Sequence, residues 1–385
     1  MSRKYHSRAR AIFGVFMAVL FLITLSGCWE LKEVDQRSFA TIIGIDAGER
    51  GEIILSVQFP TLHKMAPLSI EGAAPTGKTF YTITVSGRTL QEAFGMLQTE
   101  TYRWAVILQN KAVIIGDEAA RKGLKPLMDW LFRYPKAPTR SLVFVAKGRT
   151  AREVLEFIPE GEIIPGLQLE MASHANSNSN RTYFIPIRMF QQKMIHRSKD
   201  PYASLIDIDT RQARYRIAGI AVFHGARLAG ELEISETQRF GMLSGLLQNG
   251  DMTFDISTER NTQAAITLQS LKIDRKIQVF LRNGLPIFCI QLQLSGKTLE
   301  LVGEGSLRPQ RVARLEKILE SKLRPDLEAT VRKLQGLNAD VIDFGEKLRV
   351  QRYEYWKRIN WGEIYPKAKF QVRLRVKIIQ DGTMR

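Results

Sequence analysis

The sequence predicts an α+β, multidomain protein whose mixed, mostly antiparallel sheets are packed against helices. The first observation is that short β-branched segments alternate with amphipathic ones over residues 38–157, which indicates a sheet with helices on it. The second is the strict period-two alternation of residues 370–378, which is typical of a half-buried antiparallel strand. A length of 385 residues suggests two or three domains.

Composition excludes several classes of protein. A hydrophobic fraction of 44% excludes global disorder and collagen-like repeats. The two cysteines, Cys28 and Cys289, are too few for a disulfide framework or a four-cysteine zinc site. The only long apolar run lies near the N-terminus, which excludes a polytopic membrane protein.

Residues 1–27 have the three parts of an export signal: a basic head, the apolar run 11–25 and small residues at the end. At about 1.5 Å per residue the run reaches roughly 22 Å, which is short of the ~30 Å hydrocarbon core. The signal ends in Leu25-Ser26-Gly27-Cys28, which resembles the bacterial lipobox. We therefore expect Cys28 to receive a diacylglyceryl group and to begin the mature chain. The alternative is an uncleaved anchor with an incidental cysteine.

The first domain of the mature chain is expected over residues 28–200. Two apolar segments, 38–46 and 52–60, flank a glycine-containing turn and predict a hairpin, and a Gly/Pro-rich loop is expected at 65–77. Thr150 is expected to cap a helix, and Pro126 to end or kink another. Further strands are predicted at 78–86, 112–115 and 141–146, and helices at 89–102, 117–132 and 150–157.

Polar breaks at 175–180 and 196–201 place the main boundary between about 180 and 212, with a second domain over 212–385 and, as an alternative, a further division near 300. This domain is expected to open with a hairpin of 217–223 and 227–232. Ser235 is expected to cap a helix to about residue 247, with Gln238 completing a capping box. Several strands follow to Leu301. A long helix starts at Gln310, is kinked or divided by Pro325, and has one apolar stripe: Val312, Leu315, Leu319, Leu323, Leu327, Val331 and Leu334.

Catalytic and metal-binding motifs are missing from the sequence, and Gly303-Glu304-Gly305 lacks the third glycine of a dinucleotide fingerprint. The histidines show no ligand spacing, and Cys289 lies on a strand beside Gln291 and Gln293 without a neighbouring base, so it is expected to be structural. Two carboxylate pairs lack the converging partners that a site needs. No catalytic residue, metal site or cofactor is therefore predicted. The pairs are Asp207 with Asp209 and Glu160 with Glu162, and the mature-chain histidines are His63, His174, His196 and His224.

Residues 347–377 combine ten Lys/Arg with two acids and five Tyr and Trp side chains. Such a stretch can bind nucleic acid, whereas an exported lipoprotein meets anionic lipid headgroups instead. The favoured interpretation is that the aromatic side chains belong to the core and the charges to a solvated face, because Trp and Tyr usually bury most of their area. No nucleic acid partner is expected. The Tyr and Trp residues are Tyr353, Tyr355, Trp356, Trp361 and Tyr365.

Short motifs in a specific order run through nearly the whole mature chain. They are the lipobox with Cys28-Trp29-Glu30, then Ile42-Ile43-Gly44-Ile45-Asp46, Ala218-Gly219-Ile220-Ala221-Val222-Phe223, Leu228-Ala229-Gly230-Glu231-Leu232, Glu236-Thr237, Asp343-Phe344-Gly345, Trp356 and Asn360-Trp361. In this order they resemble the Ger(x)C lipoprotein family, the C subunits of nutrient germinant receptors of endospore-forming bacteria. Glu30 stands where that family often has Asp, which leaves lipidation untouched.

The resemblance implies a non-enzymatic protein tethered by acylated Cys28 to membrane lipid at the outer face of the spore inner membrane. It also implies two integral membrane partners, an A-type subunit and a permease-like B-type subunit, in a complex that senses amino acids or sugars and triggers ion release. The implied fold is a multidomain α+β arrangement of mixed sheets. Only Cys28 takes a defined chemical role from the family. The alternatives are a solute-binding lipoprotein of an import system and an exported hydrolase, which the missing motifs disfavour.

Overall fold

The computed structural model describes residues 13–14, 16–17, 21, 36–61, 79–134, 139–160, 164–175, 179–257, 264–302 and 308–379. The chain divides into two units, residues 1–38 and 39–385. Strand β1 (Arg37–Phe39) lies across that division. Most of the predicted signal, Cys28 and the predicted loop 65–77 lie outside the described residues. The second unit, residues 39–385, contains both of the larger sheets.

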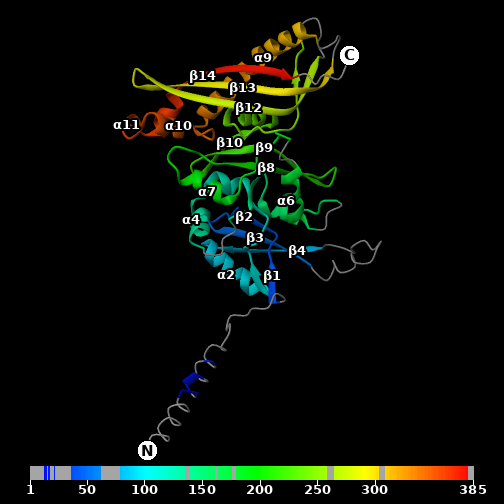
Figure 1. The fold of residues 1–385 in the computed structure, drawn as a ribbon. Helices are drawn as coiled ribbons and strands as arrows, with labels where there is room; N and C mark the ends of the chain where they lie inside the picture. The colour runs from blue at the N-terminus through cyan, green and yellow to red at the C-terminus, as the bar shows by residue number, and fades with distance from the viewer. Residues whose placement is uncertain are drawn as a thin grey trace, which may run out of the picture. The chain divides into compact units, whose positions relative to one another are not determined.

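An eight-stranded sheet in the order β10-β9-β8-β7-β6-β2-β3-β4 forms the larger part of this unit (Figure 1). Its four central strands are parallel, and an antiparallel hairpin extends the sheet at each end. The predicted hairpin 38–46/52–60 is confirmed as the pair β2–β3. The strands are β2 (Ile42–Ala47), β3 (Ile53–Pro60), β4 (Phe80–Gly87), β6 (Ala112–Ile115), β7 (Leu142–Ala146), β8 (Tyr202–Asp209), β9 (Arg214–His224) and β10 (Arg227–Leu232).

Helices cover both faces of the central strands, as parallel strands require, because each crossover carries a helix onto one face. Strand β6 is accordingly buried at every residue. One apolar cluster joins α5 and α6 to one face, and the larger cluster joins the remaining helices to the other. The helices are α2 (Leu90–Glu100), α3 (Asp117–Lys122), α4 (Lys125–Arg133), α5 (Ala151–Glu156), α6 (Pro165–Ala175) and α7 (Ile187–Ile195), and the short strand β5 (Trp104–Val106) follows α2.

The helix termini confirm one predicted cap and differ from two other predictions. Thr150 caps α5 in a capping box with Glu153. The predicted helix 117–132 is two helices that break at Gly123, and Pro126 lies in the first turn of α4. A proline is well suited to that position, because the first turn needs no N–H donor there. Ser235 is not a cap: α8 (Ile234–Ser244) begins after Glu233, whose backbone N–H donates to the Glu236 carboxylate at 3.0 Å.

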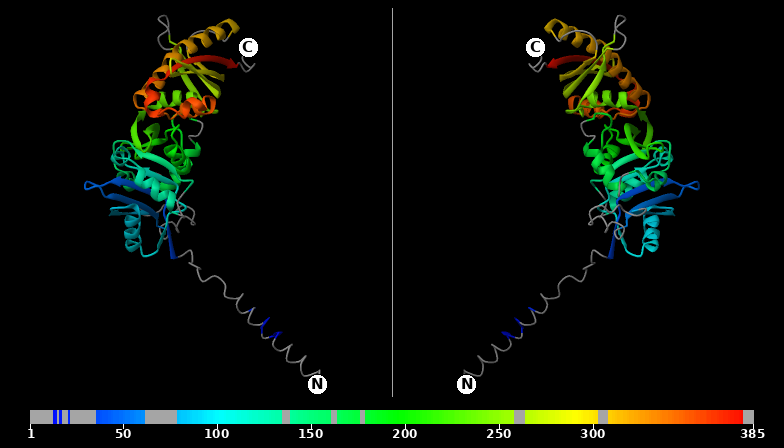
Figure 2. Two further views of the ribbon diagram at one scale, coloured as in Figure 1. Left: turned by 90° about the vertical axis from the view of Figure 1, so that its left-hand side faces the viewer. Right: turned by 90° about the vertical axis from the view of Figure 1, so that its right-hand side faces the viewer.

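A second sheet of four strands, in the order β11-β12-β13-β14, lies at the C-terminal side of the unit (Figures 1 and 2). Two 18-residue strands form a long hairpin, and β14 pairs with β13 in parallel. The expected antiparallel direction of the last strand is therefore wrong. The helices between β13 and β14 return the chain to the same end of the sheet, which makes the pair parallel. The strands are β11 (Met252–Asp255), β12 (Ala265–Arg282), β13 (Leu285–Val302) and β14 (Lys369–Ile379).

The long helix α9 (Pro309–Gly336) packs along β14. Its predicted apolar stripe is confirmed: six of the seven side chains are buried, and Leu323 is partly buried. Pro325 does not divide the helix. Two glutamates of α9 also accept backbone N–H groups of the edge strand, Glu320 from Val376 at 2.9 Å and Glu316 from Ile378 at 2.8 Å. These carboxylates occupy donors that an exposed edge would offer to another strand.

The remaining helices follow α9 and complete the C-terminal region. They are α10 (Phe344–Gln351), α11 (Tyr353–Trp356), α12 (Trp361–Ile364) and the 3₁₀ helix η4 (Tyr365–Lys367). No helix in the described part of the chain is both long enough and apolar enough to cross a bilayer.

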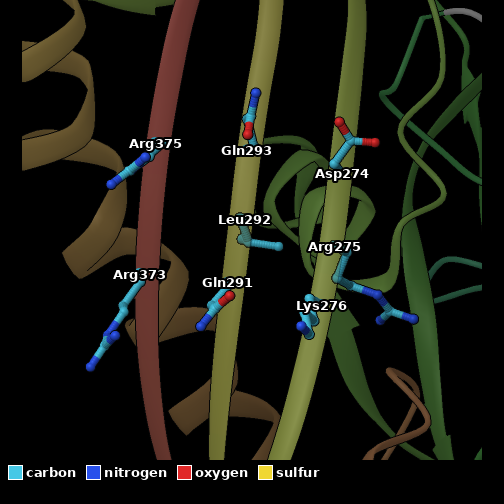
Figure 3. Close-up of a pocket in the computed structure, with 8 residues that line it drawn as sticks. All are labelled: Asp274, Arg275, Lys276, Gln291, Leu292, Gln293, Arg373 and Arg375. Carbon is cyan, nitrogen blue, oxygen red and sulfur yellow. The ribbon is translucent and has the colours of Figure 1, made fainter.

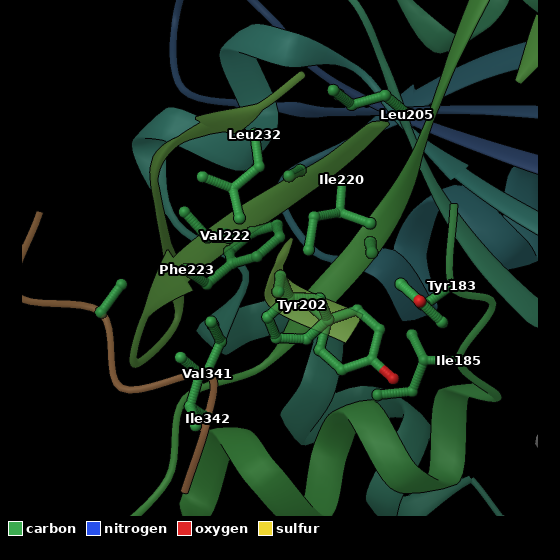
Figure 4. Close-up of a cluster of buried hydrophobic side chains, with 14 of the residues drawn as sticks. Tyr183, Ile185, Tyr202, Leu205, Ile220, Val222, Phe223, Leu232, Val341 and Ile342 are labelled. Carbon is green, nitrogen blue, oxygen red and sulfur yellow. The ribbon is translucent and has the colours of Figure 1, made fainter. Parts of the chain in front are cut away.

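The eight-stranded sheet continues across the position predicted for the domain boundary. Strand β9 pairs with β8, and β10 pairs with β9, so residues 214–232 complete a sheet that begins at residue 42. Val341 and Ile342, which follow α9, lie beside Phe223 and Tyr202 in one buried cluster (Figure 4). The two predicted domains therefore share both a sheet and a core. Antiparallel pairs outnumber parallel ones, and the predicted mixed α+β class is confirmed.

We expect the double variant Glu316→Ala/Glu320→Ala to leave the two β14 N–H groups without these acceptors. Each loss should lower the free energy of unfolding by about 1–2 kcal/mol, and the open edge should promote self-association. Denaturant titration and light scattering measure the two effects. Glu316→Gln/Glu320→Gln retains an acceptor oxygen at each position and should stay close to the parent. Equal behaviour of both double variants would contradict the edge-capping role.

Candidate functional site

A polar cleft of about 1010 Å³ lies where the eight-stranded sheet meets the C-terminal helices. Its walls come from the segment before β8, the β9–β10 turn, the segment after α9, and α10 to α12. We call it the junction cleft. The residues lining it are His196, Arg197, Lys199, Asp200, His224, Gly225, Asn338, Asp340, Arg349, Tyr353, Trp356, Lys357, Ile359, Asn360, Trp361, Gly362 and Tyr365.

Asp340 is the buried centre of the cleft floor. Its carboxylate accepts the backbone N–H of Phe344 at 2.9 Å and of Gly345 at 2.6 Å, and the indole N–H of Trp361 at 3.0 Å. It therefore holds the start of α10 and the start of α12 together. Burial raises the pKa of Asp340 to about 7, although the two backbone donors act in the opposite direction.

Asp200 connects this centre to the eight-stranded sheet. Its side chain accepts the backbone N–H of Asp340 at 2.8 Å and of Gly225 at 2.6 Å, while its own N–H donates to the Asp340 carbonyl at 3.0 Å. His224 lies 3.7 Å from the same carboxylate. The Asp200 carboxylate raises the pKa of His224. The Asp200–Asp340 pair joins positions that are 140 residues apart in the sequence.

Three further polar contacts extend the connection between the eight-stranded sheet and the C-terminal helices. Ser198 hydroxyl donates to the Glu346 carboxylate at 2.8 Å, and Arg349 forms an ion pair with Glu346 at 2.7 Å. The Arg349 guanidinium, opposed by burial, holds the pKa of Glu346 below its usual range. Lys193 forms an ion pair with Asp343, the residue before α10. The Ser198–Glu346 and Lys193–Asp343 contacts thus link the chain before β8 to α10 and to the residue before it.

Two glycines of the sequence motifs lie at close approaches between the same regions. A Cβ atom on Gly345 would lie 2.6 Å from the Trp361 indole nitrogen and 2.9 Å from the Ser198 carbonyl oxygen. A Cβ atom on Gly230 would lie 2.7 Å from a methyl group of Leu337, the residue after α9. Gly345 leaves no room for a side chain, because the Ser198 carbonyl belongs to the backbone, whereas at Gly230 the Leu337 side chain would have to move to admit one.

Asp46, which ends the first of the internal motifs, also has a structural partner. Its carboxylate accepts the N–H groups of Ala151 at 2.7 Å and Arg152 at 3.0 Å, at the start of α5. Burial raises the pKa of Asp46, while these two donors act against the rise. The motif thus fixes a helix onto β2.

Among the residues weighed in the sequence as candidates, Asp207 and Asp209 do not form a common site. Cys28, His63 and Glu162 lie outside the described residues. Asp209 accepts the backbone N–H groups of Arg211 and Gln212, each at 3.1 Å, and does not converge with Asp207 on a site.

Asp207 is engaged in ion pairs, with Arg216 at 2.7 Å and Arg149 at 3.4 Å. Burial raises its pKa, but the Ile208 N–H and the two guanidinium groups outweigh burial and lower it. Among the residues that the structure describes, no group of three His, Cys, Asp or Glu side chains is arranged to hold a metal.

Sequence reasoning missed the junction cleft. His196 and His224, which show no useful spacing, line it together with Asp200 and Asp340. The favoured interpretation of the aromatic stretch is confirmed for four of its members: Trp361 and Tyr365 are buried, and Tyr355 and Trp356 pack against the core. Tyr353 is exposed.

Two models of known protein families match this chain. The model of the spore germination protein N-terminal domain matches residues 30–208, and that of the spore germination B3/GerAC-like C-terminal domain matches residues 218–382. The chain belongs to the Ger(x)C family of spore germination proteins. Family membership gives it a role in spore germination.

Individual relatives of this Ger(x)C protein agree over almost the full length. Spore germination protein B3 of Bacillus subtilis (strain 168) is 26% identical, over 94% of this chain and 96% of the relative. Spore germination protein KC of the same organism is 22% identical, over 97% and 96% respectively. The crystal structure of the GerBC protein has the same fold, with a TM-score of 0.54 and 20% identity over 91% of this chain and 100% of that one.

Gly345→Ala tests the close approach in the junction cleft. The added methyl group would press on Trp361 and on the Ser198 carbonyl, so we expect the free energy of unfolding to fall by about 1–3 kcal/mol. Gly336→Ala is the matched control, because a Cβ atom there has nothing within 4 Å. It should leave stability unchanged or raise it by up to about 1 kcal/mol. Denaturant unfolding that gave equal values for both variants would contradict the tight packing.

The raised pKa of Asp340 predicts a pH dependence of stability. Its ordinary value is about 4 in an unfolded chain, so the folded protein binds this proton more tightly. The stabilising contribution is present below about pH 4 and is lost as the pH rises through about 7. His224, whose pKa is also raised, changes stability in the same direction.

Asp340→Asn should therefore reduce the decline of the unfolding free energy between about pH 4 and pH 7. It should also lower stability at every pH, because the amide N–H₂ accepts no hydrogen bond, so either Phe344 or both Gly345 and Trp361 lose their acceptor. Asp129→Asn, at an exposed position of α4, is the control and should keep the parent slope. An unchanged slope in Asp340→Asn would show that this carboxyl is not the titrating group.

Proposed function

We propose that this protein is a non-enzymatic, lipid-anchored subunit of a nutrient germinant receptor at the outer face of the spore inner membrane. Acylated Cys28 holds it there, and it assembles with two integral membrane subunits, an A-type subunit and a permease-like B-type subunit. The observation that carries the proposal is the position of the family match. It starts at residue 30, two residues after Cys28, and continues to residue 382.

The roles of the motif residues support an interaction subunit rather than an enzyme. Asp46, Gly230, Gly345 and Trp361 connect elements to one another and do not surround a reacting group. Side chains that hold helices and strands rigidly to one another suit a protein that presents fixed surfaces to partners. Such surfaces bind with little loss of conformational entropy.

Exposed aromatic side chains support a position close to the membrane. Ala40 donates a backbone hydrogen bond to Val106 of β5 at 2.9 Å, so β5 lies beside the entry of the chain into the compact unit. Tyr102 is 84% exposed and Trp104 51% exposed. The chain from Cys28 to Ala40 reaches at most about 43 Å, and Trp and Tyr favour the headgroup region of a bilayer.

Cys28→Ala should leave a folded protein that is no longer retained in the membrane. The variant lacks the sulfur that accepts the lipid, whereas Cys289→Ala keeps it and serves as the control. Acyl labelling, globomycin-sensitive processing and membrane fractionation measure the effect in the native host. Unlabelled Cys28→Ala protein that still fractionated with the membrane would contradict lipid anchoring.

A further inference from the structure

One face of the four-stranded sheet is left open. Side chains of β14 alternate strictly: Val372, Leu374, Val376 and Ile378 are buried on the side where α9 packs, and the residues between them are exposed. The open side is continuous across three strands, because Lys276 is in register with Gln291 and Arg373, and Asp274 with Gln293 and Arg375. The basic face, as we name it, consists of Lys272, Asp274, Lys276, Gln291, Gln293, Arg373, Arg375 and Lys377.

The basic face carries five cations and one acid. In the part of the chain that the structure describes, none of these five cationic side chains forms an ion pair. Arg373, Arg375 and Lys377 follow one another on the same side of β14, so their charges lie about 6–7 Å apart. Like charges so placed repel one another, and the repulsion opposes folding. The arrangement therefore favours an anionic partner.

An uncharged stripe runs between the cationic rows. Gln291 and Gln293 on β13 carry amide groups that both donate and accept hydrogen bonds. A groove of about 560 Å³ lies over this stripe. Figure 3 shows the two glutamines on the middle strand, between Arg373 and Arg375 of β14 and Asp274 and Lys276 of β12.

We propose that the basic face is a docking surface for an extended, acidic segment of a partner protein, lying along β13. An extended segment projects every second side chain to the same side at about 6–7 Å, which matches the spacing of Arg373, Arg375 and Lys377. The glutamine amides would meet its backbone, and the flanking cations its carboxylates. The groove favours a segment over a lipid surface, because amide groups between cation rows recognise a backbone and add little at a bilayer.

This proposal rests on the proposed function only for the identity of the partner, which would be another subunit of the receptor. Its test uses the full-length chain in detergent solution, where binding requires no attachment to a membrane. Failure of the Cys28→Ala experiment and failure of the docking proposal are therefore distinguishable.

The probe is a fluorescein-labelled peptide of alternating Glu and Thr, with a Lys/Thr peptide as the charge-reversed control. Fluorescence anisotropy should show saturable binding of the Glu/Thr peptide that weakens as salt rises. Arg373→Glu/Arg375→Glu should weaken it at least about tenfold. Arg314→Glu/Lys317→Glu changes the charge equally at exposed positions of α9 and should stay within about twofold.

Two further variants distinguish loss of the docking surface from misfolding and from simple attraction of charge. Arg373→Gln/Arg375→Gln removes the charges without adding acids and should weaken binding about threefold or more. Gln291→Thr/Gln293→Thr keeps the charge and suits a strand, and it should weaken binding about threefold with the same salt dependence. Thermal unfolding of each variant shows whether the fold is retained.

Three results would overturn the proposal. One is that the Glu/Thr peptide does not bind. Another is equal loss of binding in the β14 pair and the α9 pair, which would show attraction to net charge alone. The third is binding only to phosphatidylglycerol/phosphatidylcholine vesicles, lost in the β14 pair, which would make the basic face a lipid-binding surface.

Discussion

Two buried aspartates, Asp200 and Asp340, hold the molecule together at the point where its sheets meet. Burying a carboxylate is costly unless hydrogen bonds satisfy it. Asp340 meets this requirement with donors from α10 and α12, and Asp200 with donors from the β9–β10 turn and from Asp340 itself. Each interaction uses a backbone N–H, or an indole N–H, that would otherwise be buried without a partner. The positions of the C-terminal helices relative to the eight-stranded sheet follow from this network.

The same contacts give several residues of the family motifs a structural role. Gly345 leaves room for Trp361, which in turn donates to Asp340, and Gly230 leaves room for Leu337. These residues are needed for close packing between distant parts of the chain. Their role explains why a sequence without catalytic motifs still has a distinctive pattern. The open basic face, in contrast, contains none of the motif residues, so a partner-binding surface on it can differ while the framework stays the same.

Local signals predicted the elements well, because they act within a few residues. The β2–β3 hairpin, the Thr150 cap and the α9 stripe are each decided by neighbours in the sequence. The direction of β14 was predicted wrongly because burial alternates in the same way in parallel and antiparallel strands. The cap of α8 was assigned to Ser235 because serine is the commoner capping residue, whereas Glu233 has that role. The junction cleft depends on partners 140 residues apart, for which no local pattern exists.

The position of the β8–β9 pair has a consequence for how such proteins diverge. The two family models meet between residues 208 and 218, an interval that covers the end of β8, the turn and the start of β9. A crossover between genes of two relatives at this point would place two of the eight strands of one sheet, and one aspartate of the buried pair, in a foreign background. Inheritance of the two halves as interchangeable modules is therefore disfavoured, and the halves are expected to evolve as one piece.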